Sequence, residues 1–365
     1  MAPSQKVLYL SKRFGDFVVE DAPIYKPGPG EILIKVQATS LNPVDWKIQK
    51  YGVFIEEFPA ILGTDVAGDV EELGEGVKEF KKGDRVFVQG QFVNDRSSFQ
   101  EYTLALASAT ARIPPNVSYD EAATLPVVLT AAYIGLYNKN PHGFGLSAPV
   151  SEATQGIYGG TPIVVLGGAS SVGQIGRDLL QRSIPTTSLS SYLFPVIQLA
   201  KLSGFSPIIT TASSKHADNL KSLGAKAVFD RDLSASDLAK EIKKLTNEPI
   251  KFVYDAVSSK ATQETGIELL ASGGQLAIVG PVSAEVDEGK SVVAVLGLSR
   301  LPHNIELVET LYHDKIAGFL EKGIIKPNKV EVLPNGLAGI RDGLKRMEEN
   351  KISGSKLVAR PQESL

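Results

Sequence analysis

Residues 162–173 read PIVVLGGASSVG, an apolar run that leads directly into a turn rich in glycine and serine. A strand that ends in such a turn and opens into a helix directs backbone N–H groups and the positive end of the helix dipole at a phosphate. The stretch therefore predicts a dinucleotide phosphate loop, with Gly167 and Gly173 as its turn and packing glycines. Ser170 stands where many such loops have a middle glycine, and it adds a hydroxyl donor. A glycine-rich turn with a purely structural role is the alternative.

Apolar strands and charged helices alternate along the chain after this loop. Further apolar runs occur at residues 207–211, 227–229, 252–254 and 275–279. Amphipathic stretches such as 214–223 and 235–245 lie between them. Because near-continuous apolar strands that alternate with helices form parallel sheets covered on both faces, this part of the chain predicts a doubly wound fold.

The residues before about 120 follow a different pattern, of short strands separated by turns. This pattern suggests a small β-barrel or sandwich, with strands at 31–36, 65–70 and 84–88. A helix is expected over 119–137, because Ser118 and Glu121 have the spacing of a capping box. Near the C-terminus we expect a helix at 335–347 and a last strand at 356–359 that returns to the first domain.

The composition excludes several classes of function. At 365 residues the chain fits two domains, and its net charge of −3 gives no basic field for nucleic acid. There is no cysteine, and the four histidines lack the spacing of metal ligands, so no metal site is expected. No apolar run is long enough to cross a membrane, and a cytoplasmic protein is the default expectation.

The end of the second predicted strand indicates which dinucleotide the loop would bind. A site for NAD usually places Asp or Glu there, to accept hydrogen bonds from the ribose 2′-hydroxyl. This chain has Ser213, Ser214, Lys215 and His216 instead, with no acid before Asp218. Hydroxyls and an ammonium suit the extra negative charge of a 2′-phosphate, so NADPH is the expected cofactor. A serine that caps a helix, followed by a solvated lysine, is the alternative interpretation.

Motifs along nearly the whole chain resemble those of the medium-chain dehydrogenase/reductase superfamily. They are KPGPGE at 26–31, NPVDWK at 42–47, GTDVAG at 63–68, GDRV at 83–86, the phosphate loop, and LGA at 223–225. Zinc-dependent relatives have a cysteine near the start and Gly-His-Glu in the third motif, whereas this chain has Asn42 and Gly-Thr-Asp at 63–65. The chain therefore looks like the zinc-free quinone oxidoreductases and enoyl reductases, above all the fungal trans-acting polyketide and toxin-biosynthesis type.

The resemblance implies an α/β protein of two domains. A GroES-like β-barrel would span residues 1–130, completed by about 330–365, and a Rossmann domain with a doubly wound parallel sheet would span 131–329. NADPH would bind between them, and its hydride would pass to an activated C=C bond (enone or enoyl) or a quinone, without zinc. A nucleotide-binding relative that is non-catalytic or regulatory is the alternative. We expect a small-molecule substrate, no nucleic-acid or membrane partner, and a monomer or homodimer.

The resemblance also implies roles for particular residues. Lys47 matches a lysine beside the nicotinamide and the substrate carbonyl, and Thr130 matches a threonine of the same pocket. As donors they would stabilise charge on the carbonyl oxygen, with Lys47 or water supplying the final proton. For Lys47 the alternative is a surface lysine, and Arg231 could pair with the 2′-phosphate or lie exposed. The other residues that match cofactor contacts are Val44, Asp45, Trp46, Ser170, Ser171, Val172, Gly173, Ser213, Ser214, Lys215, His216, Val279, Gly280, Lys356 and Leu357.

Segment 176–196 does not fit this pattern. The helix expected after the loop starts as VGQI at 172–175 and resumes as IQLAKLSG at 197–204, so the segment interrupts one helix, where insertions are rarely tolerated. An unremoved intron is one explanation. The codon for Gly176 can contain the GT of a splice donor, and the codons for residues 194–196, Phe-Pro-Val, can contain the AG of a splice acceptor. The product would be a catalytically impaired splice form. A genuine insertion, with a second helix from about Phe194, is the alternative.

Overall fold

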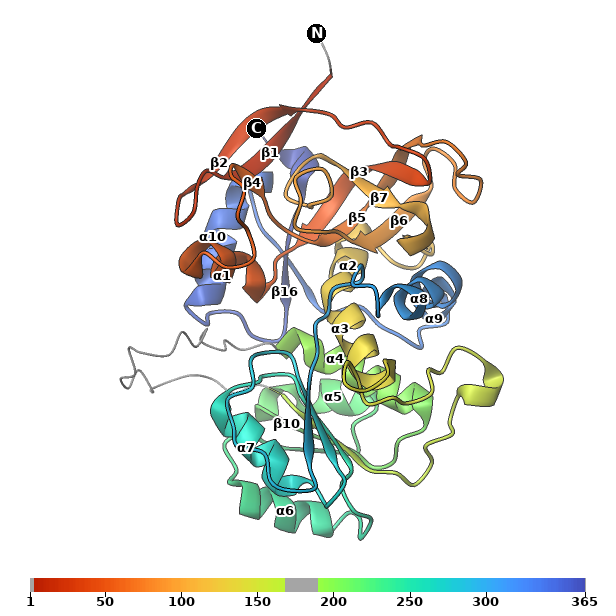
Figure 1. Cartoon of the computed structure of the whole chain (residues 1–365), viewed down its shortest axis with the longest axis vertical. Helices are drawn as coiled ribbons and strands as arrows, with labels where there is room; N and C mark the ends of the chain where they lie inside the picture. Colours follow the sequence, from red (N-terminus) through yellow and green to blue (C-terminus); the bar gives the residue numbers. More distant parts are fainter. Residues whose placement is uncertain (1–2, 168–189, 365) are drawn as a thin grey trace. The chain divides into compact units, whose positions relative to one another are not determined.

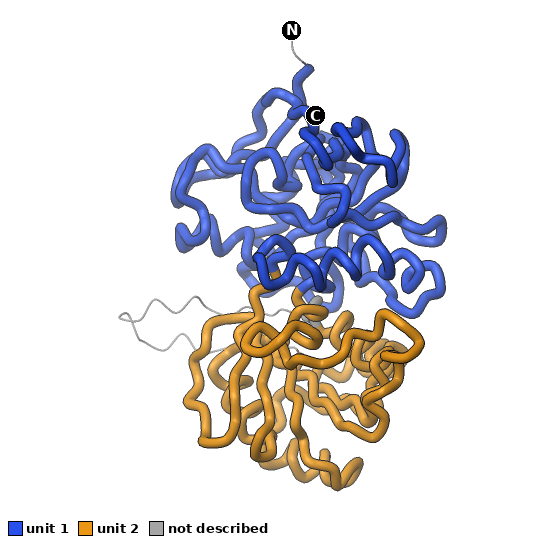
Figure 2. The backbone as a smooth tube through the Cα atoms, turned by 45° about the vertical axis from the view of Figure 1, so that its right-hand side comes forward, with its two compact units in different colours: residues 1–130, 298–365 blue, residues 131–297 orange. Residues whose placement is uncertain are grey.

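The computed structural model describes residues 3–167 and 190–364 of the chain, and of residues 190–192 it describes the backbone alone (Figure 1). The chain divides into two compact units (Figure 2). Unit 1 consists of residues 1–130 and 298–365, and unit 2 of residues 131–297. Unit 1 thus includes residues 298–329, which the sequence analysis assigns to the nucleotide-binding domain.

Unit 1 contains two β-sheets. The smaller sheet has the order β2-β1-β4. The larger sheet has the order β15-β16-β3-β5-β6-β8, with β7 also paired to β3. The strands are β1 (Ser4–Leu10), β2 (Phe17–Pro23), β3 (Glu31–Ser40), β4 (Ala60–Ile61), β5 (Asp65–Leu73), β6 (Arg85–Gln89), β7 (Tyr102–Leu106), β8 (Ala111–Arg112), β15 (Val330–Val332) and β16 (Lys356–Ala359).

Strand β3 shows how the sequence builds the larger sheet. Ile32, Ile34 and Val36 alternate along it and are fully buried, in one core with Val66 of β5 and Val86 of β6. Such alternation is what a strand with one face on a core requires. The strands expected at 31–36, 65–70 and 84–88 are thereby confirmed as β3, β5 and β6.

The helices of unit 1 are α1 (Pro43–Tyr51), α2 (Tyr119–Ala123), the start of α3 (Pro126–Tyr137), α8 (Ile305–Glu309), α9 (Ile316–Glu321) and α10 (Gly336–Glu348), with a π-helical stretch at Thr310–Lys315. Helices α1 and α10 lie side by side (Figure 1). Trp46 and Ile48 of α1 share an apolar core with Leu337, Ile340 and Leu344 of α10. The helix expected near the C-terminus is therefore confirmed, and it supports the helix that carries Lys47.

The single helix predicted over 119–137 was wrong, because the chain forms two helices there. The capping box is present: the side chain of Ser118 accepts from the backbone N–H of Glu121, whose carboxylate reaches back to the N–H of Ser118. Pro126 then ends this first helix, since proline lacks the N–H that a continuing helix needs and its ring clashes with the preceding turn. It becomes the first residue of α3 instead, and the unit boundary between Thr130 and Ala131 falls inside α3.

Unit 2 is a six-stranded parallel sheet of order β11-β10-β9-β12-β13-β14. The predicted doubly wound sheet is confirmed, with the strand order that binds dinucleotides where the order reverses, between β9 and β12. Its elements are β9 (Ile163–Leu166), α4 (Ser190–Ser203), β10 (Ile208–Ala212), α5 (Ala217–Leu223), β11 (Ala227–Asp230), α6 (Ala235–Lys243), β12 (Phe252–Asp255), α7 (Lys260–Leu269), β13 (Gln275–Ile278) and β14 (Ser291–Ala294).

Helices cover both faces of this sheet. On one face, Val164 and Leu166 of β9 form a core with Leu238 and Ile242 of α6 and with residues of α7. The alternate residues of β9 point to the opposite face, along which α4 packs against β9, β10 and α5. Because the central strand β9 is buried on both faces, all four of its residues are apolar.

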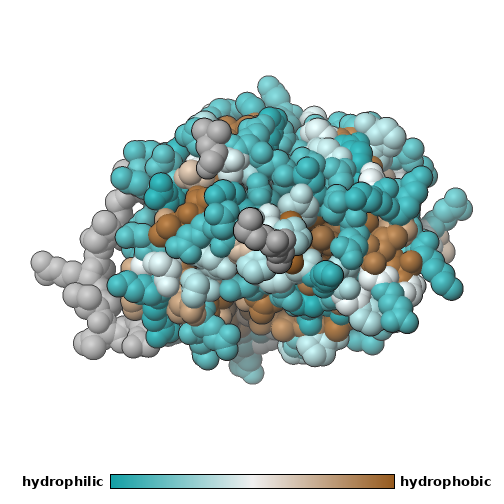
Figure 3. Space-filling view, turned by 90° about the horizontal axis from the view of Figure 1, so that it is seen from above, coloured by the Kyte–Doolittle hydropathy of each residue, from teal (hydrophilic) through white to brown (hydrophobic). Residues whose placement is uncertain are grey.

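The surface carries few large apolar groups. Figure 3 shows one face that is mostly hydrophilic, with hydrophobic residues in small separate patches. The most exposed apolar side chains are single residues such as Phe14, Phe54 and Leu296. Within the described ranges, none of the helices has both the length and the apolar character needed to cross a membrane.

Candidate functional site

The carboxyl end of β9 carries the first of the predicted cofactor residues, Gly167. A Cβ atom on Gly167 would lie 2.6 Å from Cδ2 of Leu193 in α4, so only glycine allows the strand and the helix to approach this closely. The backbone N–H of Gly167 donates to the hydroxyl of Thr211 at 3.3 Å. Gly167 is thus a packing glycine. Ser170, Ser171, Val172 and Gly173 lie outside the described residues.

Helix α4 begins inside the segment that interrupts the family pattern. Residues 176–189 of that segment lie outside the described part of the chain. The rest of it belongs to α4, where Leu193, Phe194 and Val196 are buried and Pro195 lies inside the helix. The end of the segment therefore contributes apolar packing beside β9.

Four predicted residues follow β10, and a fifth follows β11. The two strands are parallel neighbours, with Ala212 in register with Asp230, so the residues after them emerge at the same edge of the sheet. Ser213 is half-buried, and Ser214 and Lys215 are exposed. The pKa of His216 is lowered by burial and by the positive charges of Lys215 and Arg231. These three basic side chains are therefore close enough to interact.

A buried carboxylate at the end of β12, Asp255, was missed by the sequence analysis. Oδ1 of Asp255 accepts from the backbone N–H groups of Val257 and Ser258 at 2.9 and 2.8 Å. Burial raises the pKa of Asp255 to about 6. The hydroxyl of Ser258 accepts from the backbone N–H of Val279 at 2.8 Å, and Val279 and Gly280 are half-buried. Asp255 therefore shapes the turn beside two predicted cofactor residues, Val279 and Gly280. Its position at the end of an apolar strand was the sequence signal that could have identified it.

Lys47 lies on α1, whose ends are fixed by its sequence. Asn42 is the N-cap, and its backbone N–H donates to the carboxylate of Asp45 at 2.7 Å. Gly52 ends the helix in the left-handed conformation, with φ of 62°. Lys47 is half-buried, and its ammonium lies 5.8 Å from the centre of the Trp46 ring. Among the described residues it has no carboxylate partner, and burial lowers its pKa to about 8.

The neighbours of Lys47 in the predicted set face the protein interior. Asp45 is fully buried, and burial raises its pKa to about 7 while the N–H of Asn42 opposes the shift. Trp46 belongs to the apolar core under α1, and Val44 packs against that core from a half-buried position. Asp45 and Trp46 therefore hold the helix that presents Lys47.

Thr130 is fully buried and hydrogen-bonded within unit 1. Its hydroxyl lies 2.9 Å from the hydroxyl of Tyr312, which donates to the carbonyl oxygen of Pro126 at 3.0 Å. Since Tyr312 has a single proton, the proton of Thr130 is the one between the two hydroxyls. In this structure Thr130 donates to Tyr312, whereas the sequence analysis expects it to donate to a substrate carbonyl.

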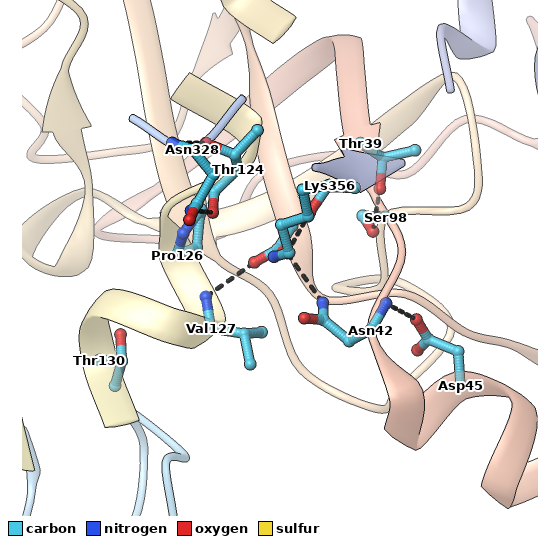
Figure 4. A network of polar contacts seen from close by, with 12 residues as sticks. Thr39, Asn42, Asp45, Ser98, Thr124, Pro126, Val127, Thr130, Asn328 and Lys356 are labelled. Carbon is cyan, nitrogen blue, oxygen red and sulfur yellow. Dashed lines mark hydrogen bonds and ion pairs between the residues drawn. The ribbon is translucent and has the colours of Figure 1, made fainter. Parts of the chain in front are cut away.

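Lys356 and Leu357 lie at the start of β16, and both are buried. The ammonium of Lys356 lies 2.5 Å from Oδ2 of Asp65, the first residue of β5 (Figure 4). The side chain of Lys356 thus pairs with a carboxylate that the sequence analysis quoted only as part of a motif. No local pattern reveals this pair, because the two residues are 291 positions apart.

Comparisons with known proteins agree with this architecture. Residues 28–115 match the model of the alcohol dehydrogenase GroES-like domain, and residues 195–308 match that of the zinc-binding dehydrogenase family. These matches confirm the predicted fold class, a GroES-like domain joined to a Rossmann-type parallel sheet.

Full-length relatives are also similar. The dehydrogenase orsE of Emericella nidulans is 30% identical over 98% of this chain and 99% of its own length. A trans-enoyl reductase of Gibberella fujikuroi is 30% identical over 90% of each chain. The solved structure of a mycobacterial protein complexed with NADPH has a TM-score of 0.71 and 22% identity, over 98% of this chain and 100% of that one. The chain is therefore an oxidoreductase of the medium-chain dehydrogenase/reductase superfamily and belongs to its fungal enoyl reductase-like branch.

Proposed function

We propose that the chain is an NADPH-dependent reductase that adds hydride, without zinc, to a C=C bond conjugated with a carbonyl group, or to a quinone. The observation that carries the proposal is the environment of Lys47. A half-buried lysine without a carboxylate partner among the described residues, and with a pKa of about 8, can hold and release a proton near neutral pH. The enoyl substrate class is supported by the trans-enoyl reductase name of a full-length relative.

The choice of NADPH rests on the edge of the sheet after β10 and β11. Lys215, His216 and Arg231 provide basic groups there, and Ser213 and Ser214 provide hydroxyls. A 2′-phosphate needs such donors, whereas a free 2′-hydroxyl needs an acid. Gly167, at the carboxyl end of β9, lies at the edge of the sheet where doubly wound folds bind dinucleotides.

The side chains that could act as metal ligands do not fit a catalytic zinc ion. The chain has no cysteine, and within its described part no three His, Asp or Glu side chains gather as metal ligands. The carboxylate of Asp65 forms an ion pair with the ammonium of Lys356 and is therefore already occupied. The charge that develops on the substrate oxygen must therefore be met by protein hydrogen bonds.

The proposed chemistry places one proton donor beside the substrate. Bound NADPH would supply the hydride, which leaves negative charge on the carbonyl oxygen of an enone. The ammonium of Lys47 donates a hydrogen bond to that oxygen and stabilises it. Lys47 or water then returns a proton to the carbon next to the carbonyl, which completes the saturated product. Thr130 and Tyr312 form a hydrogen-bonded pair that fixes α3 and is not required to donate to the substrate.

A panel of substrates tests the proposal. Oxidation of NADPH would be followed at 340 nm with enones, enoyl thioesters and quinones, with NADH as the comparison cofactor. We expect turnover with at least one of these classes and a clear preference for NADPH. Turnover of saturated alcohols, or NADPH binding without turnover of any of these compounds, would contradict the proposal, and the second result would identify a nucleotide-binding protein without catalysis.

A further inference from the structure

One buried carboxylate joins the starts of two helices in unit 1. Asp65 has no exposed surface. Its Oδ2 accepts from the side-chain amide of Asn42 at 2.8 Å, from the hydroxyl of Ser40 and from the ammonium of Lys356 at 2.5 Å. Its Oδ1 accepts from the backbone N–H of Val127 at 2.7 Å. Figure 4 shows Lys356, Asn42 and Val127 directed at this carboxylate from three parts of the chain.

These contacts fix the two helices that carry the predicted donors. Asn42 is the N-cap of α1, which carries Lys47, and Val127 is the second residue of α3, which carries Thr130. At α3, Asp65 satisfies one of the backbone N–H groups that a helix start leaves without partners inside the helix, whereas at α1 it accepts from the side-chain amide of the N-cap residue Asn42. Because its two oxygens serve different helices, Asp65 sets the position of one relative to the other.

We infer that Asp65 is a positioning residue for the reductase reaction and that Lys356 is its counter-ion rather than a cofactor ligand. The inference rests on the proposed function, since it gives Asp65 the task of holding Lys47 in place. A buried ion pair is weak evidence for stability, because desolvation offsets its attraction. The four donors that meet this carboxylate instead specify one arrangement of α1, α3, β3 and β16.

Two variants separate positioning from stability. Asp65→Asn leaves the ammonium of Lys356 buried without its counter-ion, so the variant loses both stability and geometry. Asp65→Asn/Lys356→Met removes the unpaired charge, and we expect its melting temperature to recover towards that of the wild type. The asparagine at position 65 still cannot accept from both helices, because one of its two polar atoms is a donor.

Two measurements on the intact protein decide the outcome. The first is the pKa of the Lys47 amine, followed by NMR after ¹³C-methylation of the lysines and assigned with Lys47→Arg. The second is kcat and KM with NADPH and the best substrate. In both variants we expect the pKa of Lys47 to move from about 8 towards its ordinary value of 10.5, as α1 shifts and Lys47 becomes solvated. We expect kcat to fall on the order of 10- to 100-fold with KM for NADPH unchanged.

Ile32→Ala is the matched control, because it opens a cavity in the core of the larger sheet, away from Asp65. It should lower the melting temperature and leave the pKa of Lys47 unchanged.

If the double variant recovers kcat together with stability, or if the pKa of Lys47 stays near 8 in both variants, Asp65 has no positioning role. A wild type without activity would defeat the proposed function alone, since the pKa of Lys47 tests the positioning role without turnover. If Asp65→Asn does not fold, the double variant carries the same test.

Discussion

Two side chains of one short helix have pKa values shifted in opposite directions by the same cause. Burial disfavours the charged form of any group, so it lowers the pKa of Lys47 and raises that of Asp45, two positions earlier. Asp45 caps the helix, and Lys47 is its candidate functional group. Each shift leads to a separate dependence on pH, one of activity and one of stability.

The activity should decline on the alkaline side of neutrality. Lys47 donates a hydrogen bond only when it is protonated, and its pKa is about 8. We expect kcat to be constant below that value and to fall as pH rises through it. Lys47→Arg keeps a proton at every accessible pH, so its residual activity should show no such decline below about pH 11. An unchanged alkaline decline in Lys47→Arg would assign the titration to another group.

The stability should depend on Asp45 in a lower pH range, and it should also fall as pH rises. Its pKa is about 7 in the folded protein, against an ordinary value of 3.8, so the folded state holds this proton more tightly than the unfolded chain does. The free energy of unfolding therefore falls as pH rises from about 4 to about 7 and is constant above that range. Asp255, with a pKa of about 6, contributes the same trend over a narrower range.

Urea unfolding at a series of pH values measures this dependence. Asp45→Asn keeps an acceptor for the N–H of Asn42 and removes the titrating group. We expect its stability to change less between pH 6 and 7 than that of the wild type, whereas Asp255→Asn should differ from the wild type mainly below pH 6. Equal slopes in all three proteins would show that neither carboxyl has a raised pKa.

At the scale of helices and strands, local sequence patterns predicted strands and helix starts. They could not predict contacts between residues that are far apart in the sequence. The apolar runs predicted five of the six strands of the parallel sheet and missed β14 at its edge, and Ser118 with Glu121 predicted the start of a helix at 119. The break before Pro126 could have been predicted, because proline disfavours a continuing helix. The pairing of Asp65 with Lys356 could not, since it depends on β5 and β16 meeting in the folded unit. The hydrogen bond from Thr130 to Tyr312 depends in the same way on residues 182 positions apart.

The contact between β9 and α4 gives a prediction for one glycine. Gly167→Ala places a methyl group 2.6 Å from Cδ2 of Leu193, so the strand and the helix must separate. We expect a loss of about 1–3 kcal/mol in the free energy of unfolding and weaker NADPH binding. Gly318→Ala in α9 is the control, because nothing lies within 4 Å of its added methyl group, and it should be neutral or slightly stabilising. Equal stability of the two variants would show that Gly167 is not needed for packing.

At the scale of the whole molecule, two units of different architecture contribute different residues to the proposed reaction. Unit 2 provides the parallel sheet, with glycine and basic residues at the ends of its strands, and unit 1 provides Lys47 and the buried network of Asp65. Full-length similarity to fungal relatives shows that the two units occur together in those proteins as well. Segment 176–196 does not fit the motif pattern on which the resemblance rests.

A shortened chain tests the origin of that segment. Replacing residues 176–196 by a single valine joins Ile175 to Ile197 through VGQIVIQLAKLSG, as removal of an intron would. We expect this variant to bind NADPH more tightly and to melt at a higher temperature than the full chain. The opposite result would follow if the segment is a genuine insertion, because the deletion also removes Leu193, Phe194 and Val196 from the buried face of α4.

The most direct test of the account compares the wild type with Lys47→Met, which removes the amine and keeps the apolar length of the side chain. NADPH affinity would be measured by fluorescence titration, and kcat by NADPH oxidation at 340 nm with the best enone or enoyl substrate. We expect an unchanged affinity for NADPH and a loss in kcat of about 100-fold or more. An unchanged kcat in Lys47→Met would contradict this expectation.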